Sequence, residues 1–342
     1  MKDSRKLYKN ILILPLLIFI SCGTPAENEQ VYSGEALGTT YNIKFTHNET
    51  LSLQSGIDSI FRVINKSMST YQADSDISRI NAGDSAIITD ENFRAVFEAS
   101  ERIYGESKGM FDPTVGKLVN AYGFGPAGPQ RELSQDVLDS LRQFVGFNKL
   151  ELRDNRIIKQ HPEIYIDFNA IAKGYAVDVI AQFLDQRGVE NYLAEIGGEL
   201  VAKGINRTRD QPWAVGIDSP AQSPGERTLQ TAVQLRDRAM ATSGNYRKNR
   251  KDPVTGRYMV HTINPITGLA EQSDLLSVSV LAENCALADG YATAFMALGY
   301  EGSLEMLTRI TGVDVYFIYM VPGENEMSVY ATPGFEEALL ED

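Results

Sequence analysis

A carboxylate and an ammonium, Asp167 and Lys173, lie close together where an apolar stretch changes into a helical pattern. Residues 164–168 alternate in a way that is typical of a strand, and residues 170–187 carry apolar side chains at helical spacing before a glycine. A helix N-terminus has unpaired N–H groups and a partial positive charge, so this turn suits a phosphate or pyrophosphate. An ordinary strand–helix junction with a surface lysine would show the same sequence features.

A second carboxylate pairs with a hydroxyl further along the chain. Asp289 and Thr293 are four residues apart within a predicted helix over residues 284–298, so they share one face of it. That face is otherwise rich in alanine, which leaves space beside the two polar groups. Carboxylate and hydroxyl oxygens are hard ligands that suit Mg²⁺ or Ca²⁺. The alternative is a solvent-facing aspartate beside a threonine that bonds back to its own helix.

His261 is the histidine whose neighbours suggest chemistry. It lies between a small, polar segment at residues 239–247, which permits close approach of a ligand to the backbone, and a glycine-ended loop at residues 264–268. The other two histidines, His47 and His161, lie beside loop signals. A buried, hydrogen-bonded histidine in the core is the alternative interpretation for His261.

Two further residues could serve a ligand or only the fold. Tyr71 follows a predicted amphipathic helix over residues 53–68, where an aromatic ring can stack on a flat ligand or pack in the core. Asp112 precedes Pro113, and this pair predicts a helix N-terminus that is capped by the aspartate and continues over residues 115–122.

The elements that must position these groups alternate between helices and hairpins. We expect an α+β fold with mixed or antiparallel sheets and packed helices, in two interlocked lobes. Further helices are predicted over residues 76–81, 90–104, 134–144 and 302–310. Hairpins or strands are predicted over residues 31–45, 149–158, 192–203, 213–217, 228–235, 257–263, 276–281 and 313–320, followed by a terminal hairpin.

The N-terminus has the pattern of an export signal. Four basic side chains precede an apolar run at residues 11–20, which is shorter than the ~20 residues that a spanning helix needs. The small residue before Cys22 resembles a bacterial lipoprotein signal, in which that cysteine becomes the lipidated first residue. We therefore expect a signal peptide over residues 1–21, a tether over residues 22–30 and one domain over residues 31–342.

Composition narrows the possible partners. The 342-residue chain has a formal net charge of −13, which argues against nucleic acid and anionic lipid headgroups as partners. Cys285 is the one cysteine after Cys22, so no disulfide framework is expected, and its apolar surroundings predict a small core residue.

Nine short motifs, in order from about Val31 to Gly334, resemble those of the bacterial FAD:protein FMN transferase family, the ApbE-like lipoproteins. The motifs are Ala-Leu-Gly-Thr-Thr40, Ser-Thr-Tyr71, Phe-Asp-Pro-Thr114, Tyr-Gly-Phe-Gly125, Asp-Phe-Asn-Ala-Ile-Ala-Lys-Gly174, Glu-Ile-Gly-Gly-Glu199, Ala-Thr-Ser-Gly244, His-Thr-Ile-Asn-Pro-Ile-Thr-Gly268 and Ala-Asp-Gly-Tyr-Ala-Thr293. Each is short, and the resemblance depends on all nine occurring in register.

The resemblance assigns roles to individual residues. It implies that Asp167 and Lys173 contact FAD, and that the main-chain carbonyl of Ala170 joins Asp289 and Thr293 in holding Mg²⁺. The further contacts to flavin and adenine that it implies are Leu37, Tyr71, Met110, Phe111, Asp112, Val260 and His261. The chain has Leu37 where the family often has methionine, and Gly290 where it often has alanine.

The implied activity is a Mg²⁺-dependent transfer of FMN from FAD to a Ser or Thr hydroxyl of a partner flavoprotein. The transfer would form a phosphoester and release AMP, with FAD in the cleft between the lobes. We expect His261 or a nearby carboxylate to take the hydroxyl proton, with Asp289 as the second catalytic residue.

The implied partners are flavin-accepting subunits of membrane electron-transport complexes. The enzyme would meet them while lipid on Cys22 holds it on the periplasmic face of the inner membrane. The alternatives are an FAD pyrophosphatase that releases FMN and AMP, and a non-catalytic FAD-binding lipoprotein.

Overall fold

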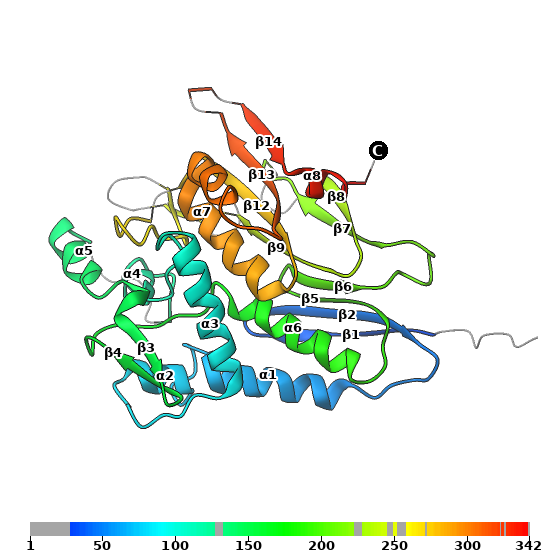
Figure 1. Cartoon of the computed structure of the whole chain (residues 1–342), viewed down its shortest axis with the longest axis horizontal. Coiled ribbons are helices and arrows are strands. Elements are labelled where there is room, and N and C mark those ends of the chain that lie inside the picture. Colours follow the sequence, from blue (N-terminus) through cyan, green and yellow to red (C-terminus); the bar gives the residue numbers. More distant parts are fainter. Residues whose placement is uncertain are drawn as a thin grey trace, which may run out of the picture.

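The molecule is organised around one eight-stranded sheet, in which every neighbouring pair of strands is antiparallel (Figure 1). The computed structural model describes residues 28–126, 133–221, 228–244, 249–251, 258–270, 272–321, 323–324 and 326–340. The strands, in spatial order, are β1 (Asn28–Ala36), β2 (Thr39–His47), β5 (Asn191–Ile196), β6 (Glu199–Lys203), β9 (Arg238–Gly244), β12 (Leu275–Ala282), β13 (Asp314–Met320) and β14 (Met327–Ala331).

Within the described ranges, three two-stranded sheets accompany the main sheet. They are β3 (Leu150–Arg153) with β4 (Arg156–Lys159), β7 (Trp213–Asp218) with β8 (Leu229–Leu235), and β10 (Asn249–Lys251) with β11 (Tyr258–Val260). The β3–β4 turn places Asp154 and Asn155 at positive φ, as expected for a tight hairpin, and confirms the predicted turn.

Helices cover one face of the main sheet. Helix α7 packs on β9 and β12, and α6 packs on β5, β6 and α7, while α1 lies against α6 and α3 against α7 (Figure 1). The helices are α1 (Gln54–Met68), α2 (Asp76–Asn81), α3 (Glu91–Glu106), α4 (Gly116–Ala121), α5 (Gln135–Arg142), α6 (Ala172–Asp185), α7 (Cys285–Leu307) and α8 (Pro333–Glu336), with a 3₁₀ turn at Phe147–Lys149. Gly299 has φ 73°, so α7 kinks where the sequence predicts one helix to end and another to follow.

Successive side chains of a strand point to opposite faces of the main sheet, so the strands contribute to two hydrophobic cores. In β6, Val201 packs against the core beneath the helices, whereas Leu200 packs against the second core. The first core is continuous from the sheet through α1 and α3 to the β3–β4 hairpin. On the opposite face, Trp213 of β7 and Phe335 of α8 close the second core. A small third cluster joins α4 and α5 to the loop around Ile263.

The predicted α+β class with antiparallel sheets is confirmed. Cys285 is a fully buried free thiol, as predicted. The described part of the small polar segment at residues 239–247 belongs to strand β9, which the sequence analysis did not predict, and the expected close approach of a ligand stays a prediction. Small side chains in β9 allow α7 to pack closely on the sheet.

The predicted strand at residues 164–168 is wrong. Its one ladder contact is an isolated parallel bridge between Tyr165 and Val115. The main chain of Ile166 bonds instead to the side chain of Asn81, which accepts from its N–H and donates to its carbonyl, each at 2.8 Å. The N–H of Asp167 donates to the carbonyl of Pro113 at 2.8 Å. These side-chain and loop partners replace a sheet neighbour, so the segment is extended without being a strand.

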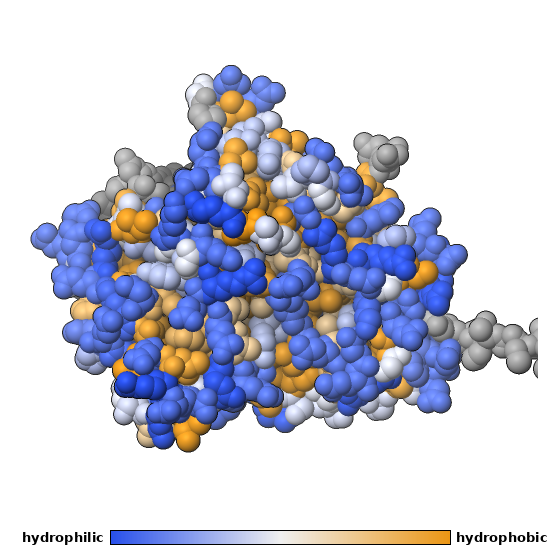
Figure 2. Space-filling view, viewed as in Figure 1, coloured by the Kyte–Doolittle hydropathy of each residue, from blue (hydrophilic) through white to orange (hydrophobic). Residues whose placement is uncertain are grey.

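The signal peptide, Cys22 and most of the tether lie outside the described residues, so those expectations stay predictions. Within the described ranges, no helix is both long enough and apolar enough to cross a bilayer. Hydrophilic residues predominate on the face drawn in Figure 2, with hydrophobic ones interspersed among them.

Candidate functional site

Hydrogen bonds to two carboxylates join helix α6 to the N-terminal part of helix α7. The carboxylate of Asp178 in α6 accepts the N–H groups of Cys285 and Ala286, at 2.7 and 2.9 Å, and so caps α7 from the neighbouring helix. In return, Asp289 of α7 accepts the N–H of Gly174, in the first turn of α6, at 3.1 Å. A Cβ on Gly174 would lie 2.2 Å from the carbonyl oxygen of Cys285, so only glycine fits there. This joint brings the sequence-predicted residues Lys173 and Asp289 together.

Lys173 faces two buried carboxylates. Its Nζ lies 2.7 Å from Oε1 of Glu199 and 3.7 Å from Oδ2 of Asp289. Glu199 and Asp289 are 5% and 3% exposed, whereas the lysine side chain is 29% exposed and reaches the surface of the cluster. We call these three residues the charged cluster. With two carboxylates and one ammonium, it has an excess of negative charge when all three are ionised.

Burial and mutual attraction act in opposite directions on these groups. Burial alone would lower the pKa of the Lys173 ammonium, but Asp289 and Glu199 together raise it above its ordinary value. Burial raises the pKa of the Asp289 carboxyl, Glu199 raises it further, and Lys173 opposes both. The lysine is therefore a fixed positive charge at neutral pH, and Asp289 is a carboxylate that an additional cation would stabilise.

The N-terminus of α6 differs from the expected phosphate site. The N–H groups of Ile171 and Ala172 both donate to the carbonyl of Phe168, at 3.0 and 2.8 Å, and that of Gly174 donates to Asp289. The prediction of several free N–H groups at this turn is therefore wrong, because the tight turn and the neighbouring helix already engage them. An anion here would depend chiefly on Lys173.

The residues beside the charged cluster suit a hard cation. Thr293 lies one turn after Asp289 on α7, and Ala170 lies just before α6, whose first turn is bonded to Asp289. Oε2 of Glu199 is buried and has no hydrogen-bond partner among the described residues. The excess negative charge of the cluster, to which this unpaired carboxylate oxygen contributes, fits a divalent ion bound nearby by oxygen ligands. No group of three or more His, Cys, Asp and Glu side chains in the described ranges is arranged to hold a metal, so main-chain or hydroxyl oxygens would complete the shell.

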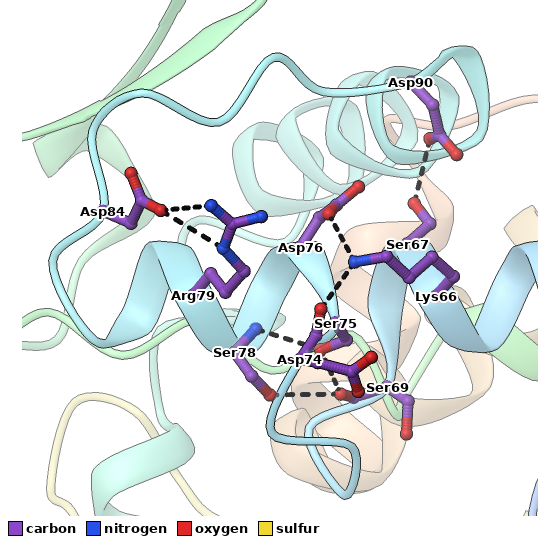
Figure 3. Close-up of polar contacts among 10 residues, drawn as sticks. All are labelled: Lys66, Ser67, Ser69, Asp74, Ser75, Asp76, Ser78, Arg79, Asp84 and Asp90. Atoms are coloured by element: carbon purple, nitrogen blue, oxygen red, sulfur yellow. Dashed lines mark hydrogen bonds and ion pairs between the residues drawn. The ribbon is translucent and has the colours of Figure 1, made fainter.

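Tyr71 lies on a loop that side chains hold in place. Its ring is 62% exposed and therefore available to a flat ligand. Figure 3 shows the contacts that fix this loop: the hydroxyls of Ser75 and Ser78 donate to the carbonyl of Ser69, at 2.6 and 3.2 Å. Lys66 of α1 forms an ion pair of 3.1 Å with Asp76, the first residue of α2, and so links the two helices that flank the loop. The loop therefore positions Tyr71 without regular structure.

The carboxylate of Asp167 affects the pKa of Tyr71. Burial raises the pKa of the Asp167 carboxyl, although it accepts the N–H of Asn169 at 2.8 Å. The pKa of Tyr71 is also raised, by partial burial and then by the negative charge of Asp167. The pKa of Tyr165 is raised too, first by partial burial and also by the negative charge of Asp167. The segment before α6 therefore places a carboxylate whose charge acts on two tyrosines.

Asp112 does not cap a helix, contrary to the sequence prediction. Helix α4 begins after Val115 and has no side-chain cap. Oδ1 of Asp112 accepts the N–H and the hydroxyl of Thr114, at 2.8 and 2.6 Å, and Oδ2 accepts the N–H of Phe147 at 3.2 Å. Burial raises the pKa of Asp112 to about 6 despite these bonds. Its side chain joins two loops instead of starting a helix.

The remaining predicted contacts lie around these groups. Phe111 is 2% exposed and packs towards α7, since a Cβ on Gly290 would lie 3.7 Å from its ring. Met110 precedes it at the end of a turn and is partly buried. Leu37 has φ 52° in the β1–β2 turn, and the N–H of Gly197 donates to the carbonyl of Thr40 at 3.0 Å, which joins that hairpin to the turn before Glu199.

The histidine strand is short. Val260 ends β11 with its side chain fully buried, and His261 follows it, half-buried. Their roles toward FAD, like those of the other site residues, stay predictions.

Glu199 and Tyr165 were not assigned a role from the sequence. The pattern held one usable signal for Glu199, because an acidic side chain directly after Gly-Gly and before Leu-Val-Ala is unusual in a buried strand. Tyr165 had no such signal, since its place beside Asp167 and Asn120 depends on a loop that forms no ladder.

Comparison with known proteins gives a consistent result. Residues 37–317 match the model of the ApbE family. A FAD:protein FMN transferase of Vibrio cholerae is 37% identical over 338 residues, covering 96% of this chain and 98% of that protein. One from Haemophilus influenzae is 32% identical and covers 92% and 93%.

Solved structures agree with these sequence matches. The flavin transferase ApbE from Vibrio cholerae has a TM-score of 0.81 at 34% identity, covering 92% of this chain and all of that one. The flavinyl transferase ApbE of Pseudomonas stutzeri, in its apo form, has a TM-score of 0.79 at 29% identity, covering 91% and 97%. The resemblance read from the nine motifs is thereby confirmed, and the chain belongs to the ApbE family.

Proposed function

We propose that this protein is a flavin transferase that moves FMN from FAD to a Ser or Thr hydroxyl of a partner flavoprotein and releases AMP. The observation that supports this most is the charged cluster at the joint of α6 and α7, on a chain that belongs to the ApbE family. Attack on a pyrophosphate requires stabilisation of negative charge on the phosphoryl oxygens and on the departing group. The Lys173 ammonium supplies part of the positive charge at a fixed position, and a cation bound at Asp289 would supply the rest, because the cluster alone has an excess of negative charge.

The reaction exchanges one phosphorus–oxygen bond for another. The acceptor oxygen bonds to the phosphorus of the FMN half of FAD, and the bond from that phosphorus to the bridging oxygen breaks, so AMP leaves with the electron pair. Lys173 faces the negative charge that grows on the phosphates. His261 takes the proton of the acceptor hydroxyl in this proposal.

Three oxygen groups would hold a Mg²⁺ ion: the carboxylate of Asp289 in the charged cluster, the hydroxyl of Thr293 and the main-chain carbonyl of Ala170. When bound, the ion neutralises phosphate charge and orients the pyrophosphate. Tyr71 and the segment from Met110 to Asp112 bind the rings of FAD, with Leu37, Asp167, Val260 and His261 as further contacts.

Location and partners complete the proposal. Lipid on Cys22, after removal of residues 1–21, anchors the enzyme on the periplasmic side of the inner membrane. The acceptors are then flavin-carrying subunits of membrane electron-transport complexes, which the anchored enzyme meets in two dimensions. Replacing Cys22 by serine should release the protein from the membrane fraction, and unchanged membrane association would contradict the anchor.

Transfer and hydrolysis are separated by following both products. The protein is mixed with FAD and Mg²⁺, with and without a Ser- or Thr-containing acceptor segment, and both AMP and the acceptor mass are measured. A transferase gives one FMN-modified acceptor for each AMP and little AMP without the acceptor. AMP formed at the same rate with an unmodified acceptor would identify a pyrophosphatase instead.

The role of His261 is tested in the same assay. His261→Ala should lower the transfer rate while FAD binding stays normal. An unchanged transfer rate would assign the proton to another base, and the nearby carboxylates would be the next candidates.

A further inference from the structure

Glu199 is a charged residue of the site that has no role in the reaction described so far. It begins β6, directly after the turn at Gly197 and Gly198, and is 5% exposed. Oε1 is in hydrogen-bond contact with Lys173 at 2.7 Å, whereas Oε2 is buried and has no partner within the described part of the chain. Burial of a carboxylate is costly unless the carboxylate is paired, so the contact with Lys173 offsets part of the cost of burying Glu199.

The Lys173 ammonium lies closer to Glu199 than to Asp289. The distance from Nζ of Lys173 to Oδ2 of Asp289 is 3.7 Å, which is beyond a hydrogen bond. The N–H of Gly174 is the donor to Asp289 at 3.1 Å. The two carboxylates therefore compete for one ammonium, and Glu199 has the shorter contact.

We propose that Glu199 is a positioning residue that draws the Lys173 ammonium away from Asp289, so that the Asp289 carboxylate stays open to a divalent cation. Without this competing contact, the lysine would move the remaining distance to Asp289 and form a direct ion pair. An ammonium bonded to the carboxylate occupies the lone pairs that a metal ion needs, and it repels the ion by its charge. Glu199 thus acts on the metal site through the lysine and not as a ligand.

This inference rests on the proposed cation site, so its test includes a measurement that examines that site separately. The probe is Mn²⁺ added to the purified protein without FAD, with the unbound ion counted by electron paramagnetic resonance. Asp289→Asn should abolish the tight binding seen in the wild type. Failure of the wild type to bind Mn²⁺, or unchanged binding by Asp289→Asn, would overturn the cation site itself and this inference with it.

A double-mutant cycle then isolates the role of Glu199. Glu199→Gln keeps the shape of the side chain but removes its charge, and should weaken Mn²⁺ binding about tenfold to a hundredfold, as for other groups that support a metal ligand. Lys173→Met removes the competing ammonium and should bind Mn²⁺ at least as tightly as the wild type. In the Lys173→Met background, Glu199→Gln should change the affinity less than twofold.

Two results would overturn the proposal while leaving the cation site in place. If Glu199→Gln weakens Mn²⁺ binding equally with and without Lys173, its charge acts directly on the ion. If it has no effect in either background, Glu199 does not influence the site. Glu195→Gln provides the matched control, because Glu195 lies on the adjacent strand of the same hairpin and its Oε1 accepts the N–H of Gly198 at 2.7 Å. It should leave Mn²⁺ affinity unchanged.

Discussion

The charged cluster is fixed by two helices and a strand, whereas Tyr71 is fixed by a loop. Lys173, Glu199 and Asp289 belong to α6, β6 and α7, and the bond from Gly174 to Asp289 ties the two helices together. Tyr71 depends on hydroxyl-to-carbonyl bonds such as that from Ser75 to Ser69 (Figure 3). Groups on regular structure keep their positions more tightly than groups on loops. The charged cluster, the charged end of the site, should therefore serve the reaction, and Tyr71, the aromatic end, should serve binding.

The comparison predicts its largest effect at the charged end, for Asp289→Asn. The change keeps the shape of the side chain but removes the charge that would hold a cation, so we expect FMN transfer to fall about 10²- to 10³-fold. The rate of AMP release in the presence of an acceptor measures this. Far-ultraviolet circular dichroism and the melting temperature serve as the folding controls. A loss of less than tenfold in a folded variant would remove Asp289 from the reaction.

The rigidity of the α6–α7 joint is tested by Gly174→Ala. The added methyl group would lie 2.2 Å from the carbonyl oxygen of Cys285, so the helices must separate. We expect a loss of about 3 kcal/mol in the free energy of unfolding, together with a loss of transfer activity. Denaturant titration measures the first quantity.

The matched control for that experiment is Gly105→Ala in α3. No atom other than those of its chain neighbours and its own helix backbone lies within 4 Å of the added methyl group, so alanine should stabilise the helix by up to about 1 kcal/mol. Equal effects of the two substitutions would show that the joint is not closely packed.

The same joint predicts a dependence of stability on pH through Asp178. Burial raises the pKa of Asp178 from 3.8 to about 6, although two N–H groups bond to it. Because the folded-state pKa lies above the unfolded one, folding favours the protonated form, and this contribution is lost as pH rises from about 4 through 6. The unfolding free energy of the wild type minus that of Asp178→Asn should therefore fall by up to about 3 kcal/mol between pH 4 and pH 7, because only the wild type loses this contribution.

Denaturant titrations at several pH values measure that difference. Asp139→Asn, on the exposed face of α5, is the control and should show no such trend. A difference that grows with rising pH would contradict the sign of the Asp178 shift.

The smallest effect is expected at the aromatic end. Tyr71→Ala should raise the KM for FAD about tenfold, because stacking of an aromatic ring on a base is worth about 1–3 kcal/mol. The melting temperature should not change, since the ring is 62% exposed. Tyr71→Phe, which keeps the ring, should bind FAD nearly as well as the wild type. A large fall in kcat at unchanged KM would break the division between a reacting end and a binding end.

Local patterns predicted the described helices except α8, which lies where a terminal hairpin was expected, and most of the hairpins, because periodicity and capping act over a few residues. Asn284 accepts the N–H of Leu287 as the cap of α7, and Gly299 interrupts that helix at the predicted place. The predicted helices and hairpins are local features of this kind, so they could be read without knowing the topology.

Features that depend on distant partners could not be predicted in the same way. Residues 164–168 alternate like a strand, but their hydrogen bonds go to Asn81 and Pro113, far away in the sequence. Asp112 looks like a helix cap and instead binds Phe147 of another loop. The contact of Glu199 with Lys173 depends on the packing of α6 over β6, which no sequence pattern specifies.

The central claim is that the joint of α6 and α7 is the centre where metal and phosphate meet. The most direct test is anomalous X-ray diffraction from crystals grown with Mn²⁺ and FAD, collected near the manganese edge. The account predicts one strong peak beside the Asp289 carboxylate, the Thr293 hydroxyl and the Ala170 carbonyl, with the FAD pyrophosphate against Lys173. A manganese peak elsewhere, or a pyrophosphate bound away from Lys173, would contradict it.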